Sequence, residues 1–402
     1  MQTSRERQKT QFKKNSRRQK RLNKNRKRNN SDAARLFRFV LRQLSQYLPD
    51  IMGEHRLTLA MMMTGLLRGR DGRLAKMAEK VVYPHKKPSL VSRFERFVKS
   101  SWVEVDPYYL PFAQEILQAV AGAEPIVLMI DSTKFGGNCI CLMVSVYYKK
   151  RAMPLVWHCF KGKKGHSDQA TQIKLLQRAQ AMLPDDTPVV LVGDGEFDGA
   201  DLLTWLKTDT AWQFVCRTTA TTLVYYQDKW LSLTKVVAEL GLATGDTAFL
   251  SQVTFIRSQP VDQLNIFIAW HPEDKTHLFF VTNCATAAEA NHWYDKRFTI
   301  ETCFGDFKSR GLFLDRTRIR HPDRLDRLIL AAAGAYYLII LMGVESIFSG
   351  IFRQLVRTDA FYHSLSQLGF IFLDHILNEG DSFPELGTLS KPDLVNHVVF
   401  PP

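Results

Sequence analysis

The chain of 402 residues contains few cysteines, and their spacing argues against a disulfide-linked or zinc-bound domain. None of the six cysteines forms a CxxC pair, and several lie in apolar runs such as CICLMVSV. This usage is typical of small core residues in a reducing compartment. The N-terminus also lacks the apolar segment of a secretory signal peptide, so we expect no leader.

Long uncharged runs are also scarce, with one informative case at residues 328–344. The run LILAAAGAYYLIILMGV carries no charge over 17 residues, which is at the short edge for a membrane span. Small residues within it, and Asp326 and Glu345 on either side, favour a buried core helix. A membrane segment is the alternative reading.

Acidic residues are almost absent from the first 30 positions, where 13 Lys or Arg accompany one acid, Glu6. The net charge of +14 therefore sits almost wholly in this arm. A tail of this kind is expected to be solvated and disordered, and to bind polyanions by releasing counterions from phosphates. The charge alone does not distinguish DNA from RNA.

Residues 31–103 show apolar side chains at helical spacing, which predicts an N-terminal helical region. Two short helices around the turn YPHKKP resemble a helix-turn-helix weakly, and a plain helical bundle is the alternative. In the first case Arg93 and Arg96 would face a duplex.

An α/β pattern follows Pro125, beginning with the buried-strand sequence IVLMID and repeated by PVVLVGD. The predicted order is three strands, helix, strand, helix, strand. The first three strands are expected to form an antiparallel meander, and the later ones to join through helical crossovers. Residues 220–275 are rich in strands and predict a β insertion, and residues 286–310 predict one long helix.

Asp131 and Asp194 each follow one of the two buried-strand sequences. Adjacent parallel strands would bring both carboxylates to the same end of the sheet, where open α/β folds place their sites. Two close carboxylates repel unless cations neutralise them, and hard oxygen ligands select Mg²⁺ or Mn²⁺. Strand-end acids also cap turns, and Glu196, Asp198 and Asp201 lie close enough to compete for the second position.

A third acid stands on the predicted long helix, within the spacing Y-x2-R-x3-E-x6-K formed by Tyr294, Arg297, Glu301 and Lys308. Steps of three, four and seven keep these side chains on one stripe of a helix. The stripe resembles the signature of the DDE transposases of the YREK group, the family around insertion sequence four.

Two further motifs carry this resemblance, which covers roughly residues 100–345. Asp131-Ser132-Thr133 is similar to the family's D-[ST]-T, and the segment from Asp194 to Asp198 is similar to its D-R-x-x-D region. Gly195 departs from the family pattern, because many members have Arg there. The resemblance implies an RNase H-like mixed sheet flanked by helices, interrupted by a β-rich insertion and preceded by the helical region.

The resemblance also implies a function. Asp131, Asp194 and Glu301 would be the catalytic and metal-binding residues, holding two Mg²⁺ or Mn²⁺ ions for cleavage and joining of phosphodiesters. Tyr294, Arg297 and Lys308 would contact the end of the element. The implied partners are double-stranded DNA, both terminal inverted repeats and target, and a second copy of the chain in a synaptic dimer. We expect no membrane, and a bacterial cytoplasmic location at the nucleoid.

Two alternatives stay open at this point. The same core could serve a metal-dependent nuclease that hydrolyses DNA without joining it, or an inert DNA-binding protein derived from a transposase. Weaker signals come from the loop KGKKGHSD, where Lys163 and Lys164 are candidate DNA contacts, and from Trp270, which is either a base-stacking or a core residue.

The predicted organisation has six parts. They are a basic arm (1–30), a helical DNA-binding region (31–103), the first part of the core (104–219), the β-rich insertion (220–275), the second part of the core (276–347) and a C-terminal region (348–402).

Overall fold

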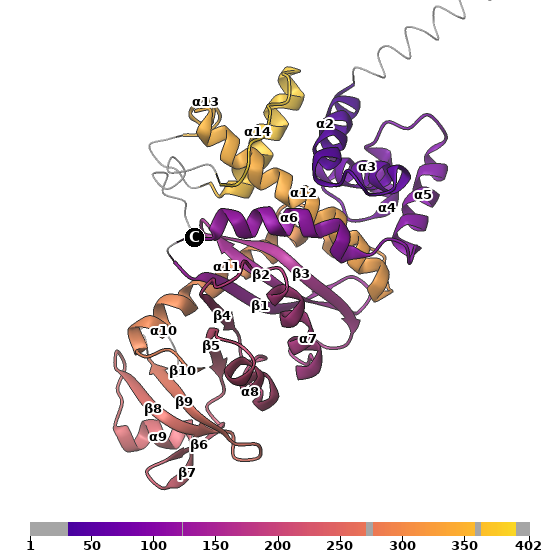
Figure 1. Cartoon of the computed structure of the whole chain (residues 1–402). Helices are drawn as coiled ribbons and strands as arrows, with labels where there is room; N and C mark the ends of the chain where they lie inside the picture. The colour runs from indigo at the N-terminus through magenta and orange to yellow at the C-terminus, as the bar shows by residue number, and fades with distance from the viewer. Residues whose placement is uncertain (1–30, 123, 271–275, 358–362, 391–402) are drawn as a thin grey trace, which may run out of the picture.

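The structure is a computed structural model that describes residues 31–122, 124–270, 276–357 and 363–390 (Figure 1). The basic arm and the end of the C-terminal region lie outside the described residues. The described chain begins with helices, continues as one large sheet and ends with helices that pack back on the first ones.

The N-terminal region is helical, as its apolar periodicity predicts. Ser31 accepts a hydrogen bond from the Ala34 amide and so caps the first helix, and Pro88 lies in the first turn of α5, where its missing N–H costs nothing. The helices are α2 (Asp32–Tyr47), α3 (Gly53–Gly69), α4 (Leu74–Glu79), α5 (Lys87–Lys99) and α6 (Val105–Val120).

A single ten-stranded sheet forms the centre of the molecule, in the order β3-β2-β1-β4-β5-β10-β9-β8-β6-β7. Its strands are β1 (Ile126–Phe135), β2 (Cys139–Tyr148), β3 (Arg151–Lys161), β4 (Val189–Gly193), β5 (Gln213–Thr218), β6 (Leu223–Tyr226), β7 (Lys229–Ser232), β8 (Thr247–Phe255), β9 (Val261–Ala269) and β10 (Leu278–Thr282).

The core half of the sheet has the predicted topology. β1, β2 and β3 form an antiparallel meander, and β1, β4 and β5 pair in parallel. The crossovers are α7 (Gln169–Gln180) and α8 (Ala200–Thr208), and Asp168 caps α7 by accepting from the Thr171 amide at 2.8 Å. This mixed α/β sheet flanked by helices is the RNase H-like arrangement that the sequence predicts.

The β-rich insertion is part of the same sheet. Its strands β6 to β9, together with α9 (Leu233–Leu240), continue the core because β9 pairs with β10 and β10 pairs with β5. Figure 1 shows these strands as the lower end of the molecule.

The helix predicted over 286–310 is continuous in the structure from Ala287 to Arg310, but it is not α-helical throughout. The segment consists of α10 (Ala287–Tyr294), a 3-10 turn η1 (Asp295–Arg297), α11 (Phe298–Gly305) and a π turn η2 (Asp306–Arg310), followed by the 3-10 turn η3 (Leu314–Arg316). The π turn begins at Asp306, whose buried carboxylate accepts hydrogen bonds from Ser366 and Tyr336 in the core. The wider turn therefore begins at a side chain that is bonded into the core.

The uncharged run forms the middle of α12 (Pro322–Phe348), which is long and apolar enough to cross a membrane but is 94% buried over its most apolar window. It is a core helix, as predicted. It packs against β3, α3 and α6 and crosses α14 (Leu365–Glu379) after the short α13 (Phe352–Leu355). A capping box of Ser364 and Gln367 starts α14.

The α12–α14 crossing depends on glycine. A Cβ at Gly369 would overlap the carbonyl oxygen of Ile339, and one at Gly343 would overlap that of Leu365. Because backbone must move to relieve either overlap, we expect Gly369→Ala to lower the free energy of unfolding by about 1–3 kcal/mol or more. Denaturant titration measures this loss. Gly53→Ala is the control, since no atom lies within 4 Å of that position, and equal losses in both variants would contradict the prediction.

Candidate active site

Two carboxylates meet where β4 ends beside the middle of β1, which continues for four residues beyond Asp131. The strands pair in parallel from Ile126 opposite Val189 to Ile130 opposite Gly193, so the next residues, Asp131 and Asp194, stand side by side. Adjacent strands are about 4.8 Å apart, which fixes the separation of the two backbones. Asp131 is only 2% exposed, whereas Asp194 is half-buried.

The local backbone holds both carboxylates in place. Asp131 accepts a hydrogen bond from the Ser132 amide at 2.6 Å, and Asp194 accepts one from the Glu196 amide at 2.9 Å. Burial and the negative charge of Asp194 raise the pKa of Asp131 to about 7, although Lys164, the Ser132 amide and Arg297 oppose this rise. The pair therefore creates an excess of negative potential that a nearby cation would relieve.

Arg297 is the cation nearest to the buried carboxylate. Its side chain is 6% exposed, and it donates to the Glu301 carboxylate at 2.8 Å while lying 4.0 Å from that of Asp131. The guanidinium lies over the ring of Phe298 at 4.4 Å and that of Tyr294 at 5.4 Å. It therefore joins the acid on α11 to the acid on β1.

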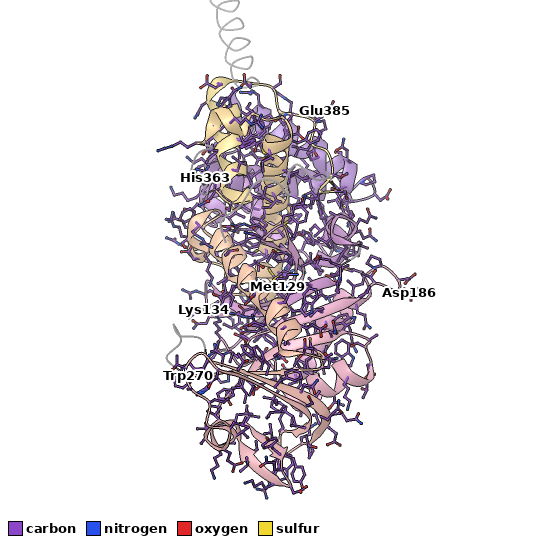
Figure 2. All side chains as sticks on the ribbon, turned by 90° about the vertical axis from the view of Figure 1, so that its left-hand side faces the viewer. Met129, Lys134, Asp186, Trp270, His363 and Glu385 are labelled. Carbon is purple, nitrogen blue, oxygen red and sulfur yellow. The ribbon has the colours of Figure 1, made fainter. Side chains whose placement is uncertain are left out.

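Glu301 reaches the site from α11, which packs on β1 and β3. Thr299, two residues before it, donates to the sulfur of Met129 at 2.9 Å, and Figure 2 labels Met129 beneath this helical segment. The side chain of Glu301 is 54% exposed and so remains open to solvent and to a ligand.

A cavity of about 460 Å³, called the acid cavity below, unites these groups. Asp131, Asp194 and Glu301 all line it, which brings together the three acids singled out in the sequence. Other lining residues are Tyr294, Arg297, Lys164, Gly195, Arg217, Thr218, Thr219, Ala220, Thr276, His277 and Phe279.

The neighbouring acids that competed for the second position have other partners. Glu196 accepts hydrogen bonds from Ser132 at 2.7 Å and from Ser167, and Asp198 accepts from Thr218 at 2.6 Å. Asp201 is exposed and accepts from Gln259. None of these three lines the acid cavity, so Asp194 is the acid that faces Asp131 across it.

The basic residues singled out in the sequence divide into two groups. Lys164 lines the acid cavity, and Lys308 donates to Thr133, two residues after Asp131, so both lie at the site. Lys163 is exposed in the adjoining loop. Away from the site, Arg96 is exposed on α5, whereas Arg93 is directed inward to Thr58 and Glu54 of α3.

Among the lining residues that were not singled out in the sequence, Arg217 and His277 carry side chains that can be charged. Arg217 lines the cavity from the second-last position of β5, which pairs in parallel with β4. The strand-end rule that selected the two aspartates therefore applies to Arg217 as well. His277, before β10, also lines it, and its ring lies 4.2 Å from that of Trp270. The His277 Nε2 is buried and has no hydrogen-bond partner within the described ranges. Trp270 is half-buried at the end of the insertion (Figure 2).

The donor set fits a hard divalent cation. Three carboxylates line one cavity, and the 4.0 Å ion pair of Asp131 with Arg297 offsets the repulsion between Asp131 and Asp194 only in part, because the pKa of Asp131 is still raised. In the part of the chain that the structure describes, no three His, Cys, Asp or Glu side chains are close enough to hold a metal ion as they stand. Glu301 is paired with Arg297 instead, so a metal would have to take over the Glu301 carboxylate.

The raised pKa of Asp131 predicts a pH-dependent cost to folding. An unfolded aspartate has a pKa near 3.8 and the folded one about 7, so the folded state binds the proton more tightly. The free energy of unfolding therefore falls by about 4 kcal/mol in total as the pH rises from the lower of these values to the higher. We expect Asp131→Asn to stabilise the metal-free protein at pH 8, and to do so by less than half as much at pH 5.

Thermal unfolding in EDTA at the two pH values measures this difference. The exposed Asp185→Asn is the matched control, because it makes the same chemical change at the surface. The same stabilisation by Asp131→Asn at both pH values would contradict the prediction.

Comparison with known proteins places the chain in a family. The family model described as "Transposase DDE domain" matches residues 125–338, which is more than half of the chain and contains every acid of the cavity. A search of curated proteins finds no match.

Solved structures with some similarity include a cryo-EM structure of the piggyBac transposase synaptic complex with hairpin DNA, at 9% identity and a TM-score of 0.45, covering 86% of this chain and 77% of that one. Another is the catalytic domain of human endonuclease V, at 14% identity and a TM-score of 0.27, covering 52% of this chain and 99% of that one. By the match over residues 125–338, the chain belongs to the DDE transposase domain family.

Proposed function

We propose that this chain is a cut-and-paste transposase of the YREK-signature group, which cleaves DNA at the ends of an insertion sequence and joins them to target DNA. The convergence of Asp131, Asp194 and Glu301 on one cavity carries the proposal. Family membership supports the broad class of DNA-cleaving transposition enzymes.

The three carboxylates would hold Mg²⁺ or Mn²⁺, two ions in each site. Bound there, the metal would activate the attacking oxygen and stabilise the leaving 3′ oxygen of a phosphodiester. Because the metals supply this chemistry, the chain needs no covalent nucleophile. After the first cut, the freed 3′ hydroxyl attacks a phosphodiester of the target, so that one bond forms as another breaks.

The cations around the cavity would position the DNA. Lys164 and Arg217 line its wall, and Lys308 reaches the strand of Asp131 through Thr133, so all three can bind phosphates next to the cut. Tyr294 is buried under the guanidinium of Arg297, and its hydroxyl is a further hydrogen-bond donor at the cavity. We propose that a homodimer assembles on two element ends.

Arg297 has a second role in this proposal. In the metal-free chain it occupies the position between Asp131 and Glu301 that a cation requires, and it partly neutralises both carboxylates. Its side chain is almost fully buried, so it keeps the two acids near each other without help from a ligand. Glu301, being more exposed, can turn from Arg297 toward a bound cation.

Replacing the carboxylate on α11 tests the assignment. We expect Glu301→Gln to keep DNA binding, because the amide oxygen can still accept from Arg297, while the cleavage rate falls by at least about a hundredfold through loss of a metal ligand. Cleavage of a duplex carrying the element end, with Mg²⁺, measures this. Glu385→Gln, at an exposed position away from the site (Figure 2), is the control and should cut normally. Undiminished cutting by Glu301→Gln would remove Glu301 from the metal site.

Joining distinguishes a transposase from a nuclease on the same core. Given a pre-cleaved element end with a free 3′ hydroxyl and a supercoiled plasmid, we expect the wild-type chain and Mg²⁺ to give a covalently joined product. Gel analysis of end-labelled DNA measures this. Hydrolysis without joining would favour the nuclease, and binding without either reaction would favour an inert DNA-binding protein.

A further inference from the structure

A second cavity, of about 510 Å³, separates the N-terminal helices from the segment that leads into α12. It is called the arginine groove below. Its walls come from α4 and α5 on one side and from residues 317–324 on the other. Glu95 is the one acid among the residues that line it, and the cations there include Arg73, Lys76, Lys99, Arg318, Arg320 and Arg324.

Three of these cations have no acidic partner. Neither an ion pair nor a hydrogen bond engages the side chains of Arg318, Arg320 and Arg324 within the described residues. Arg318 and Arg320 are exposed, and Arg324 is half-buried. Unpaired arginines gathered on one surface create a strong positive potential and favour an anionic partner.

A buried acid organises the opposite wall. Asp71 is 6% exposed, and both of its carboxylate oxygens accept hydrogen bonds from the guanidinium of Arg73. The guanidinium of Arg316 lies 3.9 Å from the same carboxylate. The amide of Gly72 also donates to the carbonyl of Phe313 at 3.1 Å. These contacts join the N-terminal helices to the segment that follows α11 and η2. The groove is therefore formed before any ligand binds.

The N-terminus of α12 adds a second source of positive potential. This helix has 27 residues and begins at Pro322, and the preceding His321 makes no side-chain capping bond. Pro322 has no N–H, so the backbone N–H groups that no side-chain cap engages begin at Asp323, at the end where the helix dipole is positive. Asp323, the acid of the first turn, lines a different cavity with Arg178 and Arg327, whereas His321 and Arg324 line the groove.

The groove is connected to the acid cavity by strand β1. Glycines 136 and 137 form the turn after β1, and a Cβ at Gly137 would lie 2.7 Å from the Cα of Arg320, so the turn packs directly on the groove. Asp131 lies six residues before Gly137, and β1 carries the chain from Asp131 to Phe135. At about 3.4 Å per residue, the groove lies about 20 Å from the acids, or about six base pairs of duplex.

We propose that the arginine groove binds the phosphodiester backbone of a DNA duplex, about six base pairs from the phosphodiester in the acid cavity. The inference rests on the proposed function, because it takes the cavity as the place where DNA is cut. Arginine forks match phosphate oxygens, and contacts of this kind position a duplex without reading its sequence.

Charge removal tests the groove. The triple variant Arg318→Gln, Arg320→Gln, Arg324→Gln should bind a 40-base-pair duplex in EDTA at least tenfold more weakly at 0.1 M salt. The slope of log K against log salt should become shallower by about 3, about 0.9 for each lost phosphate contact. The control Arg42→Gln, Lys174→Gln, Lys235→Gln removes the same charge from exposed positions elsewhere. An unchanged slope, or an equal change in the control, would overturn the proposal.

A measurement on the unmodified chain covers the case in which the triple variant does not fold. Modification by p-hydroxyphenylglyoxal, read by mass spectrometry, should be suppressed at Arg318 and Arg320 when the 40-base-pair duplex is added. Arg42 should remain reactive. Equal reactivity of the groove arginines with and without DNA would refute the groove as a binding surface.

Two probes identify the source of the DNA. A duplex with the terminal sequence that flanks the gene and an unrelated duplex are each bound by wild type and triple variant. If the triple variant loses affinity only for the terminal-sequence duplex, the groove binds the element end. If it loses affinity only for the unrelated duplex, the groove binds the target. Equal loss on both assigns it to duplex backbone in general, and no loss on either overturns it.

Failure of the groove and failure of the proposed function give different results. If only the groove proposal fails, the triple variant binds and cuts DNA as wild type does. If only the proposed function fails, the triple variant loses binding, while wild type binds without cutting or joining in Mg²⁺.

Discussion

The parallel register of β1 and β4 is the constraint on which the rest of the site depends. It places Asp131 and Asp194 side by side where β4 ends, and burial leaves Asp131 with little water to solvate its charge. The surrounding structure compensates only in part, through one backbone amide, the ammonium of Lys164 and the guanidinium of Arg297. The residual repulsion favours cation binding, so the same strand pairing that builds the core also prepares the chemistry.

The contacts of Arg297 explain how acids from distant segments stay together. Its guanidinium pairs with Glu301 and approaches Asp131, while two aromatic rings hold it from the other side. An ion pair between two exposed side chains would contribute little to the free energy of unfolding, but the side chain of Arg297 is almost fully removed from water. Only the arginine of this pair is buried, since Glu301 is 54% exposed, so the pair gives geometric precision more than stability.

Much of the core was predictable because its signals are local. Apolar runs that end in an acid mark buried strands, and helical spacing correctly placed Tyr294, Arg297 and Glu301 on one side of the chain, at one cavity. The change to a π turn at Asp306 was not predictable from local spacing, and the partners of that carboxylate, Ser366 and Tyr336, are remote in sequence. Arg217 was missed because the strand-end rule was applied to acids alone, although this residue stands next to Asp194 in the register of β4 and β5. The inward direction of Arg93 likewise depends on its partner on α3.

The continuity of the ten-stranded sheet has a consequence for how the chain can be divided. β10 belongs to the core, yet one of its edges is covered only by β9 of the insertion. Excising residues 220–275 would uncover a row of unsatisfied amides and carbonyls on β10, the kind of edge that recruits strands from other molecules. The insertion is therefore a structural cover as well as an addition, and a shortened chain would require a substitute strand to remain monodisperse.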